Sequence, residues 1–360
     1  MSYARFFILT LILSVALIAC SSEDTPEPTS TPEPTVAPTA EPQAASDPVR
    51  ILRLDSYHTE FPWTAEITRG ALEGLSENGF VADGENVIFD EYFMDTKRNT
   101  SEEYFEQISA DTIAYIEETQ PDVVIASDDN AARLVVQPMR NSGIPFVILG
   151  LNGTPEQYEF DATASVTAVL ERPHTDEMIV WIGQVIGENA RISILAEDSP
   201  TSERMFSDNV VQNAIDESPL EFVEITYTND YEDWQEFVNN APQTSDVLFL
   251  GAYATLRNDA DEAIEPVEAL RWAVANSEIP VMGFWEEAVH DGTLGGAIIS
   301  GNVQGHEAGV RAAMILNGTP ASEIPHSAPP RGKLIINRAA MEKWNVEVPL
   351  ELLEVSEIIE

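Results

Sequence analysis

The chain has 360 residues, of which 44% are hydrophobic and 8% aromatic, so a substantial buried core is expected. Its 18 basic and 62 acidic residues give a formal net charge of −44, which argues against a nucleic-acid partner and against electrostatic docking on anionic lipid. An acidic, lysine-poor surface fits either a saline habitat, where counter-ions screen self-repulsion, or simply an acidic extracellular protein.

The N-terminal segment has the features of a bacterial secretory signal. Arg5 precedes an apolar run over residues 6–18, which is too short to span a bilayer comfortably. The run ends in Leu-Ile-Ala-Cys, which resembles a lipobox, and Cys20 is the single cysteine of the chain. The alternative is an ordinary signal followed by an unused thiol. We expect residues 1–20 to be a lipoprotein signal and lipidated Cys20 to anchor the protein to the cell membrane, outside the cytoplasm.

Residues 21–47 are rich in Pro, Thr and Glu and nearly free of large apolar side chains. Such a segment buries too little surface to offset its ordering entropy, so we expect a disordered spacer. From residue 48 onward the chain is long enough for two domains of ordinary size.

Short apolar runs alternate with amphipathic stretches in the first half of this region. The predicted strands cover residues 50–54, 87–93, 122–126 and 145–149. The predicted helices cover residues 64–78, 101–118 and 130–142, with Ser101 near one start and Gly79 and Gly143 after two ends. Strands such as those over residues 122–126 and 145–149 are apolar on both faces, as parallel strands covered by helices on each side must be.

The pattern repeats in the second half. Predicted strands cover residues 166–170, 191–195, 222–226, 247–251 and 280–283, and predicted helices cover residues 175–186, 202–216, 231–239 and 260–275. The alternation predicts an α/β fold with two lobes, each a doubly wound parallel sheet. Ligands of such sheets bind beyond the carboxyl ends of the strands, so we expect one shared cleft.

The loop after the first predicted strand carries aromatic and imidazole rings before a helix start. Tyr57, His58 and Trp63 are candidates for stacking on a ligand and hydrogen-bonding to it. The alternative is that Phe61 and Trp63 fix the following helix to the core.

Polar side chains also follow other predicted strands. Asp128, Asp129 and Asn130 stand near a helix start, where they can cap the helix or bind a ligand amine or hydroxyl, and we expect capping to occupy one carboxylate. The remaining candidates for ligand binding after strand ends are Asn152, Glu171, Asp198, Tyr253, Trp285 and Glu286. Acidic residues are so common here that only their recurrence after strand ends gives them weight.

Catalytic motifs are missing. The five histidines lack the spacing of a zinc site, and the sequence has no nucleophile elbow and no phosphate-binding glycine loop with lysine. A pair of carboxylates from distant loops would still allow acid–base chemistry. We expect no enzyme, no cofactor and no metal site.

From about residue 50 to 355, the chain resembles the substrate-binding proteins of ABC transporters with the type I periplasmic-binding fold. It is most similar to the branch related to aromatic-amino-acid-binding components and to similar ligand-sensing modules. The resemblance is carried by SYHTEFPWT, ITRGALEGL, ASDDNA, LGLN, VTAVLER, GGAIISGNVQGHEAGVRAAMILNGTPASEIP and KLIINRAAMEKWNVEVP. Asp128 and Asp129 stand where the family has small residues, which argues against simply assuming an aromatic amino acid as ligand.

The resemblance implies two lobes joined by a three-segment hinge that close on a small ligand. Residues 48–165 and 284–330 would form the N-terminal lobe, with residues 295–300 returning to it and a helix over 304–316 packing there. Residues 166–283 would form the C-terminal lobe, and residues 331–360 would pack across both. The crossovers would lie near residues 166–170 and 281–284.

The resemblance predicts a lipid-anchored, monomeric protein that binds a solute and delivers it to an ABC permease. The alternative is a sensory component that reports the ligand to a histidine kinase or a similar partner, and neighbouring genes would separate the two. Burying several carboxylates in a closed cleft requires donors or cations. We therefore expect a cationic, zwitterionic or polyhydroxylated ligand, and at best weak binding of multiply charged anions.

Overall fold

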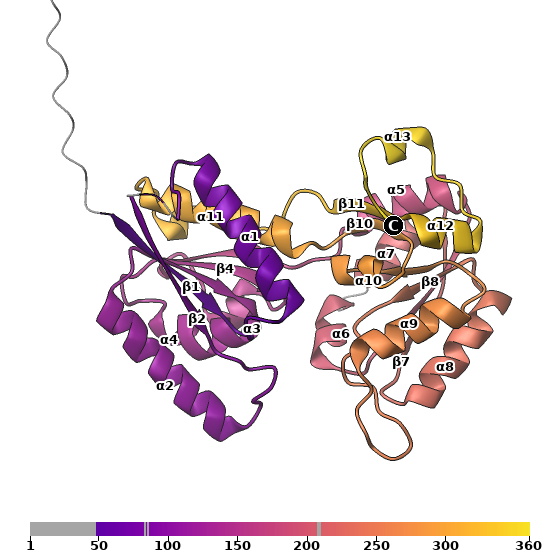
Figure 1. Ribbon diagram of the computed structural model, residues 1–360, viewed down its shortest axis with the longest axis horizontal. Coiled ribbons are helices and arrows are strands. Elements are labelled where there is room, and N and C mark those ends of the chain that lie inside the picture. The colour runs from indigo at the N-terminus through magenta and orange to yellow at the C-terminus, as the bar shows by residue number, and fades with distance from the viewer. Residues whose placement is uncertain (1–47, 83, 85, 207–209) are drawn as a thin grey trace, which may run out of the picture. The chain divides into compact units, whose positions relative to one another are not determined.

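The computed structural model describes residues 48–82, 84, 86–206 and 210–360. The predicted parallel α/β fold is confirmed, with two parallel sheets covered by helices (Figure 1). The predicted signal, the spacer and Cys20 lie outside the described residues. No helix in the described part of the chain is long and apolar enough to cross a membrane.

The first lobe is built on a five-stranded parallel sheet in the order β2-β1-β3-β4-β5. Its strands are β1 (Val49–Asp55), β2 (Val87–Phe93), β3 (Val123–Ser127), β4 (Phe146–Leu151) and β5 (Val166–Leu170). Its helices are α1 (Pro62–Glu77), α2 (Glu102–Thr119), α3 (Asp128–Ala131), α4 (Gln137–Met139) and α11 (Gly301–Leu316). A π-helical turn, Ala132–Val136, joins α3 to α4.

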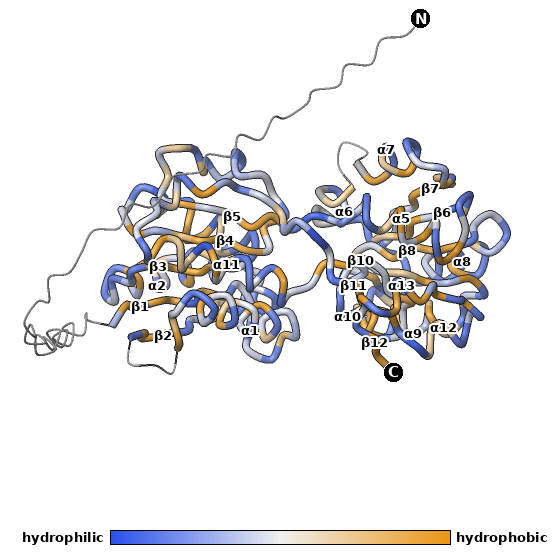
Figure 2. The backbone as a smooth tube through the Cα atoms, turned by 90° about the horizontal axis from the view of Figure 1, so that it is seen from above, coloured by the Kyte–Doolittle hydropathy of each residue, from blue (hydrophilic) through white to orange (hydrophobic). Residues whose placement is uncertain are grey.

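Both faces of the first sheet are buried, as its apolar strands predicted. Alternate residues divide between two clusters: Ile51 and Val123 pack with side chains of α1 and α11, whereas Leu52 and Val124 pack with side chains of α2 and of the helical segment after β3. Side chains alternate across a strand, so a strand buried on both faces needs an unbroken apolar run. Figure 2 shows these hydrophobic strands within each lobe.

Helices α1 and α11 lie side by side although they are more than 200 residues apart in the sequence (Figure 1). Glycines at the contact let the backbones touch. A Cβ atom on Gly305 would lie 2.0 Å from the carbonyl oxygen of Ile67, and one on Gly70 would lie 2.0 Å from that of Asn302. The glycines of the ITRGALEGL and GNVQGHEAG segments therefore serve helix packing.

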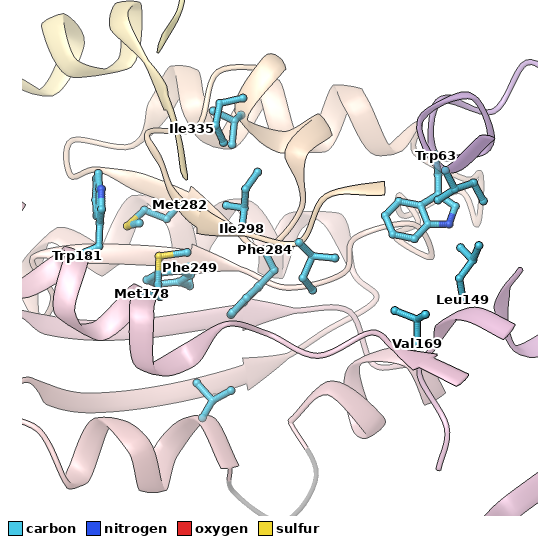
Figure 3. Packing of buried hydrophobic residues seen from close by; sticks show 14 of the residues in the cluster. Trp63, Leu149, Val169, Met178, Trp181, Phe249, Met282, Phe284, Ile298 and Ile335 are labelled. Carbon is cyan, nitrogen blue, oxygen red and sulfur yellow. The ribbon is translucent and has the colours of Figure 1, made fainter. Parts of the chain in front are cut away.

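The second lobe contains a four-stranded parallel sheet in the order β7-β6-β8-β9. Its strands are β6 (Arg191–Ala196), β7 (Glu221–Tyr227), β8 (Val247–Leu250) and β9 (Val281–Gly283). Its helices are α5 (Thr175–Val185), α6 (Pro200–Met205), α7 (Val210–Asp216), α8 (Tyr231–Asn240), α9 (Pro266–Asn276) and α10 (Glu286–His290). Part of the core beneath α5 is seen in Figure 3, where Met178 and Phe249 lie beside each other.

A third sheet, in the order β10-β11-β12, was not predicted. It consists of β10 (Gly295–Ile298), β11 (Lys333–Asn337) and β12 (Glu357–Ile359). The helices α12 (Arg338–Trp344) and α13 (Leu350–Leu353) lie between β11 and β12 in the chain. Strand β10 pairs antiparallel with β11 and contacts β9 and α5. Gly295 makes this pairing close, since a Cβ there would lie 2.0 Å from the carbonyl oxygen of Ile335.

This sheet changes where two predicted segments pack. Residues 295–300 were expected in the first lobe, but β10 joins the second lobe and only α11 reaches the first. Residues 331–360 were expected across both lobes, yet their described contacts are with the second: Trp344 Nε1 donates to the Ser277 carbonyl at 3.2 Å, just beyond α9. The assignment of the other residues to each lobe remains a proposal.

One helix prediction was wrong at its start. The helix expected over residues 260–275 begins at Pro266, because the side chain of Asn258 accepts hydrogen bonds from the backbone N–H groups of Ala260 and Glu262 and forms a turn. Asp261 has a left-handed φ of 59°, which ends any helix there.

Arg311 of α11 is almost fully buried and forms hydrogen bonds with β5 and with the segment near Ser327. Its guanidinium donates to the carbonyl oxygens of Ala168 at 2.6 Å and Pro325 at 3.1 Å, and to the hydroxyl of Ser327 at 2.7 Å. Glu307, one turn earlier, accepts from the same group at 3.1 Å. One side chain thus joins α11, β5 and the segment that returns to the second lobe.

Candidate functional site

The carboxyl ends of the central strands of the first sheet bring acidic and aromatic side chains together. Tyr57 follows β1, Asp128 follows β3 and Glu171 follows β5. Burial and the charges of Asp128 and Glu171 raise the pKa of the Tyr57 hydroxyl well above its usual value. The three predicted residues therefore lie in one neighbourhood, at the edge where parallel sheets bind ligands.

Asp128 is the most unusual residue of this neighbourhood. The residue is only 5% exposed, and its Oδ2 atom has no hydrogen-bond partner among the described residues. Its backbone has a left-handed φ of 68°, which few non-glycine residues adopt. Burial raises the pKa of its carboxyl well above the usual value, and the charges of Asp55 and Glu171 raise it further.

The neighbouring predicted residues serve the structure of the loops. Asp129 accepts hydrogen bonds from the backbone N–H groups of Asn152 at 3.1 Å and Gly153 at 2.9 Å, and from the hydroxyl of Tyr158 at 2.5 Å. Asn130 donates to the hydroxyl of Thr96 at 3.0 Å. These bonds hold the loop after β4 against the start of α3.

The expected capping of this helix by a carboxylate is wrong. Ser127 is the residue before α3, and its side chain makes no capping hydrogen bond to that helix. The hydroxyl of Ser56, after the neighbouring strand β1, instead accepts from the backbone N–H of Ala131 at 2.9 Å. Capping from another strand leaves Asp128 without this role.

Trp63 lies in the first turn of α1 and is 6% exposed. Its indole packs beside Leu149 in Figure 3, and Cβ atoms on Gly150 and Gly301 would lie 3.4 Å and 3.1 Å from it. The alternative of a residue that fixes the helix to the core therefore has direct support. Its Nε1 atom nevertheless has no hydrogen-bond partner in the described part of the chain, so a donor remains.

His58 and Lys97 both lie close to the Phe61 ring. His58 Nδ1 is 3.5 Å from a carboxylate oxygen of Asp95. The Lys97 ammonium lies over two rings, 4.6 Å from the centroid of Tyr57 and 4.9 Å from that of Phe61. These distances suit a cation–π interaction, so a positive charge stands beside the acidic neighbourhood.

Glu171 connects the neighbourhood to the second lobe. Its Oε1 atom accepts a hydrogen bond of 2.8 Å from the indole Nε1 of Trp285, which follows β9. Burial raises the pKa of Glu171 from 4.5 to about 7, although the Trp285 bond opposes this, and the charges of Asp129 and Glu287 add to the rise. Two residues predicted from separate loops are thus in direct contact.

We expect Glu171→Gln to stabilise the protein at alkaline pH. Because its pKa is higher in the folded protein than in the unfolded chain, Glu171 makes the protein less stable as the pH rises. Its contribution to the free energy of unfolding is fully present below about pH 4.5 and is lost as the pH rises towards 7. Glutamine carries no charge and keeps an oxygen for Trp285. Unfolding curves of the two proteins should nearly coincide at pH 4.5 and differ by about 3 kcal/mol above pH 8. Glu118→Gln, on the exposed surface of α2, is the matched control and should show no such separation.

Arg172, the base nearest these residues in the sequence, is occupied by the backbone. Its guanidinium donates to the carbonyl oxygens of Leu151 and Asn152, each at 3.0 Å, and of Gly153 at 3.0 Å. Gln304 of α11 supports the same loop by accepting from the Gly150 N–H at 3.3 Å. Arg172 therefore shapes the site rather than offering a free cation to an anionic ligand.

In the second lobe, the loops after β6 and β8 hold one another. Glu197 is 3% exposed and accepts from the Ser199 hydroxyl at 2.7 Å and the Thr255 N–H at 2.8 Å. Asp198 is exposed, and its backbone pairs with the side chain of Asn229. Tyr253 packs against Trp234, with ring centroids 6.2 Å apart.

Glu286 is buried at the start of α10 and forms an ion pair with Lys333 of β11. A cavity of about 380 Å³ lies beside it, between the start of α1 and α10. Acidic side chains dominate its lining, which includes Glu66, Glu286, Glu287 and Asp291. Trp285, which donates to Glu171, directly precedes Glu286 of the lining, so the cavity adjoins the acidic neighbourhood.

Sequence reasoning missed Lys97 and Asp55. Asp55 is fully buried, and its Oδ2 atom is 2.5 Å from the guanidinium of Arg53, which is buried as well. A charged pair two residues apart at the end of a predicted strand was the available signal. For Lys97, the signal was rarity, since it is one of three lysines and stands in the loop after β2.

The described residues contain no group of three His, Cys, Asp or Glu side chains that could hold a metal ion. The acidic neighbourhood instead offers carboxylates, aromatic rings and indole donors. This combination suits hydrogen bonding to, and stacking on, an organic solute.

Comparison with known families identifies one match across nearly the whole folded region. A family model described as ABC transporter substrate binding protein matches residues 58–358. No match was found among curated proteins.

Solved structures with a similar fold have low sequence identity to this chain. A ligand-free, open substrate-binding protein with adhesive properties from Clostridium difficile is 18% identical, with a TM-score of 0.67 over 87% of this chain and 99% of that one. An ABC domain from Streptococcus pneumonia in complex with L-Trp is 15% identical, with a TM-score of 0.62 over 87% and 100%. A periplasmic solute-binding protein from Actinobacillus succinogenes with bound D-allose is 16% identical, with a TM-score of 0.50 over 78% and 94%. At these identities the likeness concerns the fold.

Proposed function

Because this chain belongs to the ABC transporter substrate-binding protein family, we propose that it captures a small solute outside the cytoplasm and delivers it to an ABC permease. The family consists of solute-binding proteins rather than enzymes. The observation that carries the proposal is the family match over residues 58–358, and the acidic neighbourhood at the strand ends supplies a site for the solute.

The solute we propose is an amino acid or another small molecule that bears an amine or several hydroxyl groups. Asp128 and Glu171 supply acceptors for such groups, and the similar fold that binds L-Trp supports this class. Contacts made by both lobes would favour a closed form, because a solute shifts the equilibrium only by its different affinity for the two forms.

A thermal-shift screen of the folded region tests capture. Amino acids, peptides, nucleosides and sugars are added one at a time, and a bound solute raises the melting temperature by mass action. A solute at one hundred times its dissociation constant adds about 2.7 kcal/mol. Capture is contradicted if no member of the screen changes the melting temperature.

We also propose that Cys20, outside the described residues, carries the lipid anchor. Replacing it with alanine removes the thiol that lipidation requires, so Cys20→Ala should move the protein from the membrane fraction to the soluble fraction. The measurement is the distribution between the two fractions after cells are broken and washed with salt. A variant that stays in the membrane fraction as the natural protein does would contradict the anchor.

A further inference from the structure

The carboxylate of Asp128 has one oxygen atom that accepts no hydrogen bond from the described part of the protein. The residue is 5% exposed, and Oδ2 has no hydrogen-bond partner there. Gly150 allows the carboxylate to approach β4, since a Cβ on Gly150 would lie 3.0 Å from Asp128 Oδ1. A buried carboxylate without partners is costly, and a charged donor is the partner that offsets this cost best.

The ammonium group of Lys97 is near enough to this carboxylate to affect its pKa, but the two do not form an ion pair. Lys97 lies over the rings of Tyr57 and Phe61, and its charge lowers the pKa of both Asp128 and Glu171. No carboxylate in the described residues is within ion-pair distance of it, whereas Lys333 pairs with Glu286 and Glu357. Neither Asp128 nor Glu171 has an ion-pair partner among the described residues, and Asp128 Oδ2 accepts no hydrogen bond there, so an ammonium group of a ligand would supply the missing partner.

We propose that Asp128, Glu171 and the Tyr57 ring form a subsite for an organic ammonium group, and that this cation binds as a proton leaves the two carboxyls. The inference rests on the proposed capture of a solute and names the group by which the solute is recognised. The proton passes to solvent, so the charge of the subsite is the same before and after binding.

The charged surroundings favour a protonated carboxyl in the empty subsite. Asp128 faces Asp55, Glu171 and Asp129, which raise its pKa together with burial, and Lys97, which lowers it. Glu171 faces Asp129 and Glu287, which raise its pKa, while Lys97 and the Trp285 indole lower it. Tyr57 has its pKa raised and stays neutral, so it contributes its ring and hydroxyl. A ligand cation would favour the ionised carboxyls and so release the proton.

The test compares primary amines with alcohols of the same carbon skeleton, from two to eight carbons, including phenylethylamine and phenylethanol. Amines should raise the melting temperature and their matched alcohols should not. For the amine that binds best, affinity measured by calorimetry should rise by up to about tenfold per pH unit between pH 5.5 and 7. Calorimetry in two buffers of different ionisation enthalpy should show one proton released.

Asp128→Asn should lower the affinity for that amine by about 10- to 100-fold, the range of a hydrogen bond to a charged group. Asparagine also tolerates the left-handed backbone, so the variant should fold. Asp216→Asn is the matched control: Asp216 is the exposed last residue of α7, and its replacement changes the formal net charge by the same amount. This variant should bind the amine as the natural protein does. Glu171→Gln should lower the affinity as well and reduce the proton release.

Three results would overturn the subsite: no amine binds, alcohols bind as well as amines, or Asp128→Asn and Glu171→Gln both bind the amine unchanged. These are distinguishable from failure of capture. If a sugar or nucleoside stabilises the protein while every amine fails, capture stands and the ammonium subsite does not.

Discussion

Replacing Arg311 with methionine is expected to lower the free energy of unfolding by about 3 kcal/mol. Methionine fills similar space but donates nothing to the carbonyl oxygens of Ala168 and Pro325, and it leaves Glu307 without its partner. Hydrogen bonds from a buried charged group contribute more than neutral ones, and here several are lost at once. Denaturant unfolding of the two proteins at neutral pH measures the difference.

Arg271→Met is the matched control. Arg271 pairs with Asp291 at 2.8 Å, but its side chain is 66% exposed, so the pair contributes at most about 1 kcal/mol. If Arg311→Met cost no more than Arg271→Met, the buried guanidinium would not be what holds α11, β5 and the returning segment together.

Adding one methyl group at Gly305 is expected to destabilise the protein by about 2–3 kcal/mol. In Gly305→Ala, the new carbon would lie 2.0 Å from the carbonyl oxygen of Ile67, so α1 and α11 must move apart. The loss exceeds the gain of about 1 kcal/mol that alanine brings to a helix. Equilibrium unfolding again provides the measurement.

Gly183→Ala separates packing from helix propensity. Gly183 lies within α5, and nothing stands within 4 Å of the position a Cβ would take. This variant should be more stable than the natural protein by about 0.5–1 kcal/mol. Equal signs for the two glycine variants would contradict close contact between α1 and α11.

The sequence predicted the parallel sheets well because local composition determines them. The first four residues of β3 are all apolar, and the two clusters of the first sheet bury alternate residues of that run. The bounds of β2 and β5 agree with the prediction. The third sheet was missed because β10 is short, begins with two glycines and pairs with a strand that comes nearly 40 residues later.

The site was predictable as a place more than as a set of roles. Polar residues after strand ends indicated where side chains would gather, and Tyr57, Asp128 and Glu171 do lie together. Their individual roles depend on hydrogen bonds between distant loops, such as those of Asp129 to Asn152 and Gly153, which no local pattern indicates. The binding experiments with Asp128→Asn and Glu171→Gln test directly whether these two residues contact the solute.

The contact between α1 and α11 also has a consequence for the order in which the protein can fold. Helix α1 needs its glycine-lined surface covered, yet the residues that cover it are Gly301–Leu316, which the ribosome adds after every strand of the second parallel sheet. Contacts between such distant parts of a chain form slowly. A nascent chain that ends before α11 would therefore leave part of one face of its first sheet, and the glycine-lined surface of α1, uncovered and prone to aggregation. The first lobe therefore becomes complete only after α11 has been synthesised.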